Sequence, residues 1–95
     1  RDFEDYICAL YRKLGYEAYT TTELREMRAL PPVIMAQRGI GEQGVDVLVK
    51  VPQEDGVKVV VVQCKHYSSP VGNKAVQEIV SAISMYNAHQ AVVIS

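Results

Sequence analysis

Three polar side chains interrupt two runs of valine, and their types and spacing suit chemistry on a phosphate. Asp46 lies in the run Gly-Val-Asp-Val-Leu-Val, and Gln63 and Lys65 end the run Val-Val-Val-Val-Gln-Cys-Lys. A carboxylate and an amide carbonyl are hard oxygen ligands that suit a divalent cation such as Mg²⁺. An ammonium group beside them orients a water molecule or stabilises negative charge on a reacting phosphate. The alternative interpretation is that the three residues are ordinary polar side chains at strand ends. Spacing alone favours this alternative.

The two valine runs predict a β-hairpin that brings these groups together. β-Branched runs bounded by turn residues are typical of strands, here 45–51 and 57–65, and Pro-Gln-Glu-Asp-Gly between them predicts the turn. Pairing positions 51 and 57 places Asp46 opposite roughly Gln63. Strand side chains alternate between faces, so Gln63 and Lys65 share one face and the residue between them points to the other.

Three segments of the chain resemble the catalytic domain of Mrr-like restriction endonucleases, which belong to the PD-(D/E)XK nuclease superfamily. They are Gly-Val-Asp-Val-Leu-Val, Val-Val-Val-Gln-Cys-Lys-His-Tyr and the helix start Gly-Asn-Lys-Ala-Val-Gln-Glu-Ile, and the resemblance extends over 3–95. It implies a Mg²⁺-dependent deoxyribonuclease, in which Mn²⁺ substitutes for Mg²⁺, that hydrolyses phosphodiester bonds of DNA in restriction or defence. The match is poorest over 21–32, which we interpret as an insertion.

The resemblance also implies roles for individual residues. It places metal ligands at Asp46, at Gln63 and at the main-chain carbonyl of Cys64, and the catalytic lysine at Lys65. Much of the superfamily has an acid where this chain has Gln63, but Mrr-like members carry glutamine, which keeps the oxygen donor and removes one charge. An acid on the first helix often reaches the metal in the superfamily, so Glu4 is a further candidate ligand. Its simpler role is a first-turn acid that favours the helix dipole.

Five residues that follow the second valine run are candidates for contact with DNA. His66 and Tyr67 lie at the strand end, where surface hydrogen bonding and simple amphipathic packing are their alternative roles. Asn73 is the expected cap of the next helix, whose N-terminus favours phosphate. Lys74 would add a phosphate contact and Gln77 would point into the site, although both also suit a solvated helix face.

The remaining pattern predicts an α/β/α sandwich around a central mixed sheet, with an αβββαβ core. An apolar stripe of Phe3, Ile7, Leu10 and Leu14 predicts a first helix over 2–14. A strand over 16–20, a short helix opened by a capping box and a strand over 33–37 follow, and either strand is a candidate partner for 45–51. A helix over 73–87, with its apolar face at Val76, Ile79, Val80, Ile83 and Tyr86, leads to a parallel strand over 91–95.

Bulk properties narrow the class of protein. Ninety-five residues with 48% apolar composition suit one globular domain, which we expect to be a piece of a longer protein because the chain lacks an initial Met and ends inside a strand. No apolar run reaches the ~18 residues of a membrane span, so no membrane partner is expected. A net charge of −1 is unlike that of proteins that coat nucleic acid. Two isolated cysteines, Cys8 and Cys64, predict buried thiols and fit a reducing cytoplasm.

Two rival functions remain open. Gln63 in an acid position, together with the near-neutral charge, also suits a catalytically inactive DNA-binding or assembly module of the same fold. A Holliday-junction resolvase would share the chemistry and differ in its preference for branched DNA. Cleavage of both strands of a duplex needs two sites, so DNA and a homodimer or higher oligomer are the expected partners.

Overall fold

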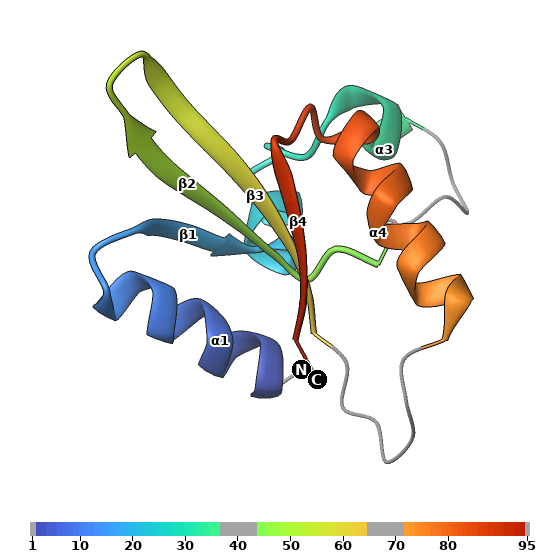
Figure 1. The fold of residues 1–95 in the computed structure, drawn as a ribbon, viewed down its shortest axis with the longest axis horizontal. Helices are drawn as coiled ribbons and strands as arrows, with labels where there is room; N and C mark the ends of the chain where they lie inside the picture. The colour runs from blue at the N-terminus through green and yellow to red at the C-terminus, as the bar shows by residue number, and fades with distance from the viewer. Residues whose placement is uncertain (1, 37–43, 65–71, 95) are drawn as a thin grey trace.

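A four-stranded mixed sheet forms the centre of the computed structural model, which describes residues 2–36, 44–64 and 72–94 (Figure 1). In this part of the chain the order of elements is α1 (Asp2–Lys13), β1 (Glu17–Thr20), α2 (Thr21–Glu26), α3 (Pro32–Ala36), β2 (Val47–Gln53), β3 (Gly56–Cys64), α4 (Asn73–Met85) and β4 (Gln90–Ile94). The strand order is β1-β2-β3-β4, with β4 parallel to β3 and the other pairs antiparallel. The predicted α/β class and mixed sheet are confirmed.

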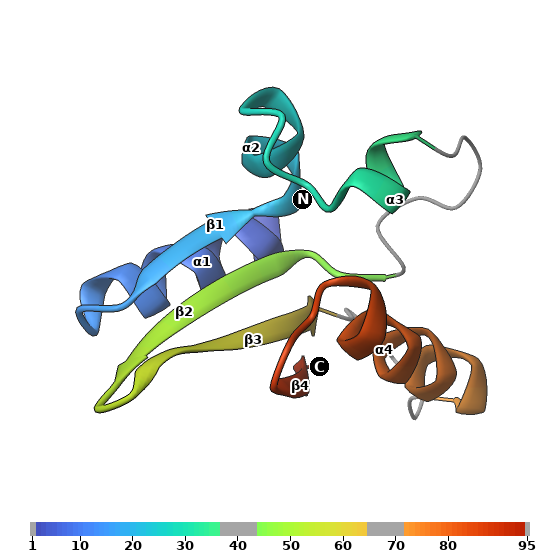
Figure 2. The same cartoon turned by 90° about the horizontal axis from the view of Figure 1, so that it is seen from above.

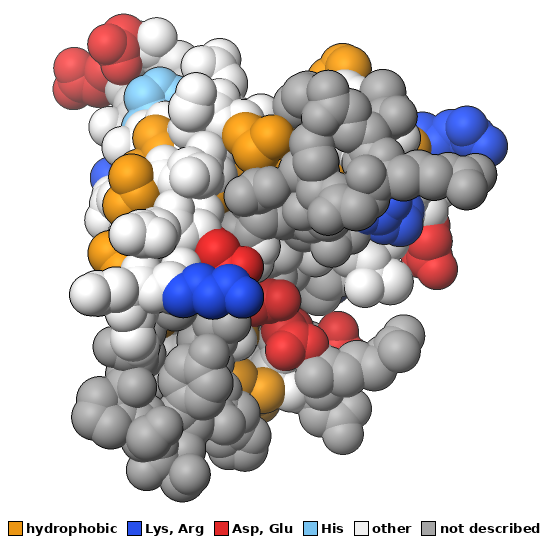
Figure 3. Space-filling view, turned by 90° about the vertical axis from the view of Figure 1, so that its right-hand side faces the viewer, with side chains coloured by type: hydrophobic (Ala, Val, Ile, Leu, Met, Phe, Trp, Pro, Cys, Tyr) orange, Lys and Arg blue, Asp and Glu red, His pale blue; other side chains and the backbone are white. Residues whose placement is uncertain are grey.

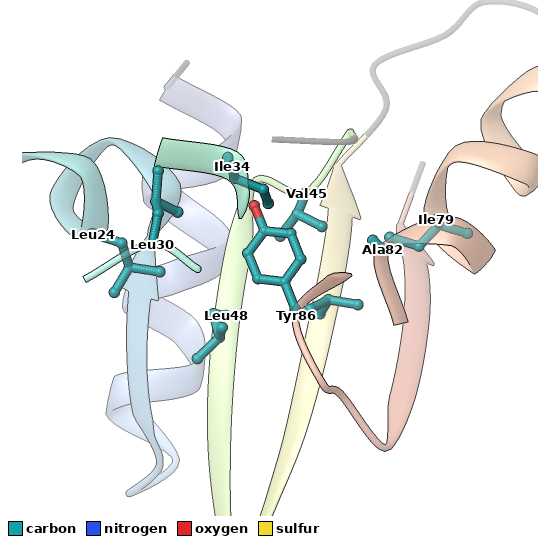
Figure 4. Packing of buried hydrophobic residues seen from close by; sticks show 9 residues of the cluster. Leu24, Leu30, Ile34, Val45, Leu48, Ile79, Ala82 and Tyr86 are labelled. Atoms are coloured by element: carbon teal, nitrogen blue, oxygen red, sulfur yellow. The ribbon is translucent and has the colours of Figure 1, made fainter. Parts of the chain in front are cut away.

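Helices cover both faces of this sheet. On one face, α1 packs against the alternate side chains of β2 and β3 that include Val47, Val49, Val60 and Val62. On the other face, α4 packs with α2 and α3 against Leu48 and Val61. Figure 4 shows the Tyr86 ring on this second face, with Leu48 and Ile34 beside it, and Figure 2 shows α1 and α4 on opposite sides of the sheet. Among the described residues, no helix is both long and apolar enough to cross a membrane.

The hairpin of β2 and β3 differs from its predicted register by one residue. Gln53 pairs with Gly56, so the turn consists of two residues and Pro52 lies inside the strand. Val47 pairs with Val62, and the same register places Asp46 level with Gln63. The turn is therefore shorter than predicted. Pro52 is tolerated in β2 because it lies beyond Lys50, where the pairing of β2 with β1 ends. The expected opposition of Asp46 and Gln63 is nevertheless preserved.

The prediction of a strand over 33–37 is wrong, because the chain forms the short helix α3 at Pro32–Ala36. Proline is well tolerated in the first turn of a helix, where its missing N–H has no partner to lose. The pair Pro31-Pro32 therefore begins a helix here as well as ending the preceding segment. β1 is the strand that pairs with β2, which settles the open choice between the two candidates.

In both long helices, the buried face is rotated about the helix axis from the predicted apolar face. On α1, Ile7 and Cys8 are buried, whereas Leu10 is 40% exposed and Leu14, beyond the helix, is 73% exposed. On α4, the residues that face the sheet are Ile79, Ala82 and Tyr86, whereas Val76 and Val80 are exposed. Small residues such as Cys8 and Ala82 carry little hydrophobic signal, although they are almost fully buried in the two core clusters. Gly72 is the N-cap of α4 and Asn73 is its first residue, so the predicted Asn73 cap is wrong.

Candidate active site

Asp46 is held at three points where the chain enters β2. Its backbone N–H donates to the carbonyl of Val62 at 2.8 Å, and its carbonyl accepts from the N–H of Thr21 at 2.9 Å. Its carboxylate Oδ2 accepts a hydrogen bond from the backbone N–H of Cys64 at 2.8 Å. The three partners belong to β3 and to the start of α2, so both the backbone and the side chain of Asp46 have a fixed position.

The start of α2 braces the residue that precedes Asp46. The Thr21 hydroxyl donates to the carbonyl of Val45 at 3.1 Å, in a buried position. Thr20 caps α2, and its side chain and Glu23 form the predicted capping box. Arg12 of α1 donates to the Glu23 carboxylate at 2.8 Å. Hydrogen bonds of this kind join α1, α2 and the entry to β2 into one framework.

A hollow of about 390 Å³ opens beside this framework, between α1, α2 and Asp46. Its charged lining residues are Glu4, Asp5, Glu23, Glu26, Asp46 and Arg12. Arg12 already forms an ion pair with Glu23. Figure 3 shows one face of the molecule, on which acidic side chains lie beside a basic one. An excess of carboxylates of this kind attracts cations and repels an unaccompanied phosphate.

Glu4 and Asp46 both line the hollow, and both affect the Cys64 thiol. Burial, followed by the negative charges of Asp46 and Glu4, raises the pKa of that thiol to about 12. Cys8 also lines the hollow. The first-helix acid expected from the family resemblance therefore faces the region of Asp46. Cys8 and Cys64 are both free and buried, as predicted.

The amide of Gln63 is fully buried, with 0% of the residue exposed. Strand alternation directs it away from the Cys64 side and toward the face that α4 covers. Neither its Nε2 nor its Oε1 has a hydrogen-bond partner among the described residues. Buried amides are nearly always paired, so an orphaned one indicates a partner outside the described residues.

Gly44 lies directly against that amide. A Cβ atom placed at Gly44 would overlap Nε2 of Gln63, and it would lie 3.5 Å from the Cβ of Glu78 on α4. Sequence reasoning treated Gly44 only as one of several turn glycines and did not connect Glu78 with the site. The signal in the sequence is weak, because the contact depends on the hairpin register and on which face of α4 meets the sheet.

The other predicted site residues fall in two groups. Lys65, His66 and Tyr67 lie outside the described residues, so the convergence of Lys65 with Asp46 and Gln63 stays a prediction. Asn73, Lys74 and Gln77 are exposed in the first turns of α4, and they are not among the described residues that line the acidic hollow. Their proposed contacts with DNA also stay predictions.

The donor set at this end of the sheet fits a hard divalent cation. In the described ranges, no group of three His, Cys, Asp or Glu side chains is arranged to hold a metal. A site here therefore needs amide or main-chain oxygens in addition to carboxylates, which Mg²⁺ accepts. The anchored carboxylate of Asp46 and the orphaned amide of Gln63 are donors of these two kinds. Asp46 lines the hollow, whereas Gln63 faces α4 and is not among the described lining residues, so their convergence on one ion stays a prediction.

A family model named Mrr_cat and described as a restriction endonuclease matches residues 1–95. No curated protein and no solved structure matches the chain.

Proposed function

We propose, from the premise that this chain belongs to the restriction endonuclease family, that it is a metal-dependent nuclease that hydrolyses phosphodiester bonds of DNA. The observation that carries the proposal is the fixed position of the Asp46 carboxylate in a hollow that is lined mainly by other carboxylates. A DNA phosphate cannot approach several carboxylates without a counter-charge. The electrostatics of the described residues therefore support a requirement for a bound cation.

Each proposed site residue has a distinct task. Asp46, the Oε1 atom of Gln63 and the main-chain carbonyl of Cys64 would hold Mg²⁺, with Glu4 as a further ligand reaching from α1. Lys65 orients the attacking water and helps to take its proton. When bound, Mg²⁺ would supply charge neutralisation for the phosphate and the leaving 3′ oxygen. His66, Tyr67, Asn73, Lys74 and Gln77 would contact the DNA around the site.

A pair of substitutions tests the assignment of tasks. Lys65→Ala should abolish cleavage of plasmid DNA in Mg²⁺ and leave DNA affinity within about twofold of the parent, because the lysine acts mainly on the water. Asp46→Asn should abolish cleavage and also weaken binding of Mn²⁺, because it removes the charged ligand. Equal loss of cleavage and DNA binding in Lys65→Ala would contradict the role given to the lysine.

A second candidate function is an inactive module of the same fold, and the burial of Gln63 favours it. An amide with 0% exposure reaches a hydrated cation only where the surrounding chain leaves a path. Titration with Mn²⁺ separates the two functions. A catalytic site binds Mn²⁺ with an affinity that falls in Asp46→Asn, whereas an inactive module shows no binding that depends on Asp46.

The substrate class within DNA is also open to a direct test. Family membership suggests restriction of foreign DNA, and cleavage of a duplex would require two copies of the site. We would incubate the full-length protein with methylated and unmethylated plasmid, in Mg²⁺ and in chelator, and measure its mass on DNA by light scattering. Cleavage of one plasmid form in Mg²⁺ alone supports a restriction role, whereas preference for a four-way junction over both plasmids would favour a resolvase.

A further inference from the structure

We infer that Gly44 is a positioning residue for Gln63, one that holds the buried amide in the orientation in which it would meet the proposed cation. The inference rests on the proposed function for the identity of the cation. Its structural part stands independently, because it concerns the packing of the metal-free chain. Because Gly44 has no side chain, it leaves the space that the Nε2 end of the buried amide occupies.

Two observations make glycine necessary at this position. Gly44 has a φ of +74°, a conformation that L side chains rarely adopt. A Cβ there would also overlap Nε2 of Gln63 and lie 3.4 Å from its Cδ. The first constraint concerns the backbone of Gly44 alone, whereas the second couples Gly44 to Gln63.

The surroundings of Gln63 determine what happens to its amide when residue 44 carries a side chain. The atom that would be displaced is the far end of a flexible side chain, so a methyl group at Gly44 moves the amide before it moves the backbone. Gln63 is fully buried, and the Cβ of Glu78 lies on the α4 side of the same small space. An amide displaced by the methyl group therefore stays inside the protein and takes another orientation there. We expect the orientation of the ligand to be lost while the fold is kept.

Gly15 provides a matched control for the backbone effect. Its φ is +95°, and a Cβ there would meet nothing within 4 Å. Gly15→Ala therefore reproduces the conformational cost of a side chain at positive φ without the overlap. Gly44→Ala carries both costs.

The experiment combines metal-free thermal unfolding with Mn²⁺ titration of the full-length protein. We expect Gly44→Ala to weaken Mn²⁺ binding at least tenfold and Gly15→Ala to leave it within twofold. We also expect the Tm loss caused by Gly44→Ala to be smaller in a Gln63→Ala background than in the parent, because removing the amide removes the overlap. If Gly44→Ala folded only in the Gln63→Ala background, that result would also support the inference, because the overlap with the amide would then be what prevents folding.

Three results would overturn the inference. They are an equal Tm loss from Gly44→Ala in both backgrounds, failure of Gly44→Ala to fold in either background, and parent-like Mn²⁺ binding by Gly44→Ala. Absence of Mn²⁺ binding in the parent protein would overturn the proposed function and the ligand role of Oε1. The metal-free Tm comparison would still decide whether Gly44 positions Gln63.

Discussion

The carboxylate Oδ2 of Asp46 accepts a hydrogen bond from the backbone N–H of Cys64 at 2.8 Å. This bond joins the entry of β2 to the end of β3, at the place where the strands present the proposed ligands. A side chain used in this way has its direction fixed before any ligand arrives. Asp46 therefore has a structural task that is separable from its proposed metal task.

Replacing Asp46 should reveal the structural task in metal-free protein. Asp46→Ala leaves the N–H of the buried Cys64 without its acceptor, which typically costs about 1–3 kcal/mol of unfolding free energy. Asp46→Asn keeps a side-chain oxygen and should lose less. Urea denaturation measures both, with Asp55→Ala in the exposed hairpin turn as the control, where a change within about 0.5 kcal/mol is expected. Equal losses in Asp46→Ala and Asp55→Ala would contradict the importance of the bond.

Thr21 should position Asp46 through its hydroxyl. The hydroxyl is buried and donates to the Val45 carbonyl, while the Thr21 N–H donates to the Asp46 carbonyl. Thr21→Val keeps the shape, removes the hydroxyl bond, and should lower the unfolding free energy by about 1–2 kcal/mol. Thr21→Ser keeps the hydroxyl and should restore most of it. If Thr21→Ser and Thr21→Val were equally destabilised in urea, packing of the methyl group would be the stabilising contact and the hydroxyl would not.

The hairpin and its polar pair could be predicted from sequence because valine runs and turn residues are local signals. The predicted register of the hairpin differs from the observed one by a single residue. Asp46 therefore still lies approximately opposite Gln63, as expected. The tertiary surroundings of Gln63 could not be predicted in the same way. Its contact with Gly44 depends on a turn conformation and on helix packing, neither of which has a periodic signature.

The helix faces show the same limit. Both helices were located from their spacing, but their buried sides depend on where the sheet approaches them. Cys8 and Ala82 occupy those positions and give little hydrophobic signal, whereas Leu10 and Val80 give a strong signal and remain exposed. Periodicity therefore fixed the existence of the helices more reliably than their rotation.

The rotation of α1 has a direct test. Ile7 is 7% exposed and packs against the valines of the sheet, so Ile7→Ala should cost about 2–5 kcal/mol of unfolding free energy. Leu10 is 40% exposed, so Leu10→Ala should cost about 1 kcal/mol or less. The pair is matched for size and lies on one helix. Losses of equal size in Leu10→Ala and Ile7→Ala, measured in urea, would restore the stripe expected from sequence, in which both residues face the core.

Glu23 should make stability fall in acid. Hydrogen bonding from the Thr20 backbone, followed by the Arg12 guanidinium, lowers the pKa of the Glu23 carboxyl in the folded state. The stabilisation is therefore fully present above the unfolded pKa of about 4.3, and it is lost as pH falls through the lower folded pKa. Because Glu23 is partly exposed, we expect about 1 kcal/mol, as for a typical helix cap. Glu23→Gln should show a shallower loss of Tm between pH 5 and pH 3 than the parent, and parallel curves would contradict the assignment.

The Cys64 thiol should report on the charge of the neighbouring Glu4. Burial, Asp46 and Glu4 together raise its pKa to about 12, so at pH 8 only about one molecule in ten thousand carries the reactive thiolate. In a Cys8→Ala background, Cys64 should therefore react with a disulfide reagent at pH 8 far more slowly in the folded than in the urea-unfolded protein. Glu4→Gln removes one of the charges that raise the pKa and should speed the folded-state reaction about two- to fivefold. Glu26→Gln is the control, because Glu26 lines the same hollow but is not among the charges that raise the Cys64 pKa. An unchanged rate in Glu4→Gln, with parent-like unfolding in urea, would place Glu4 too far from the end of β3 to join Asp46 as a metal ligand.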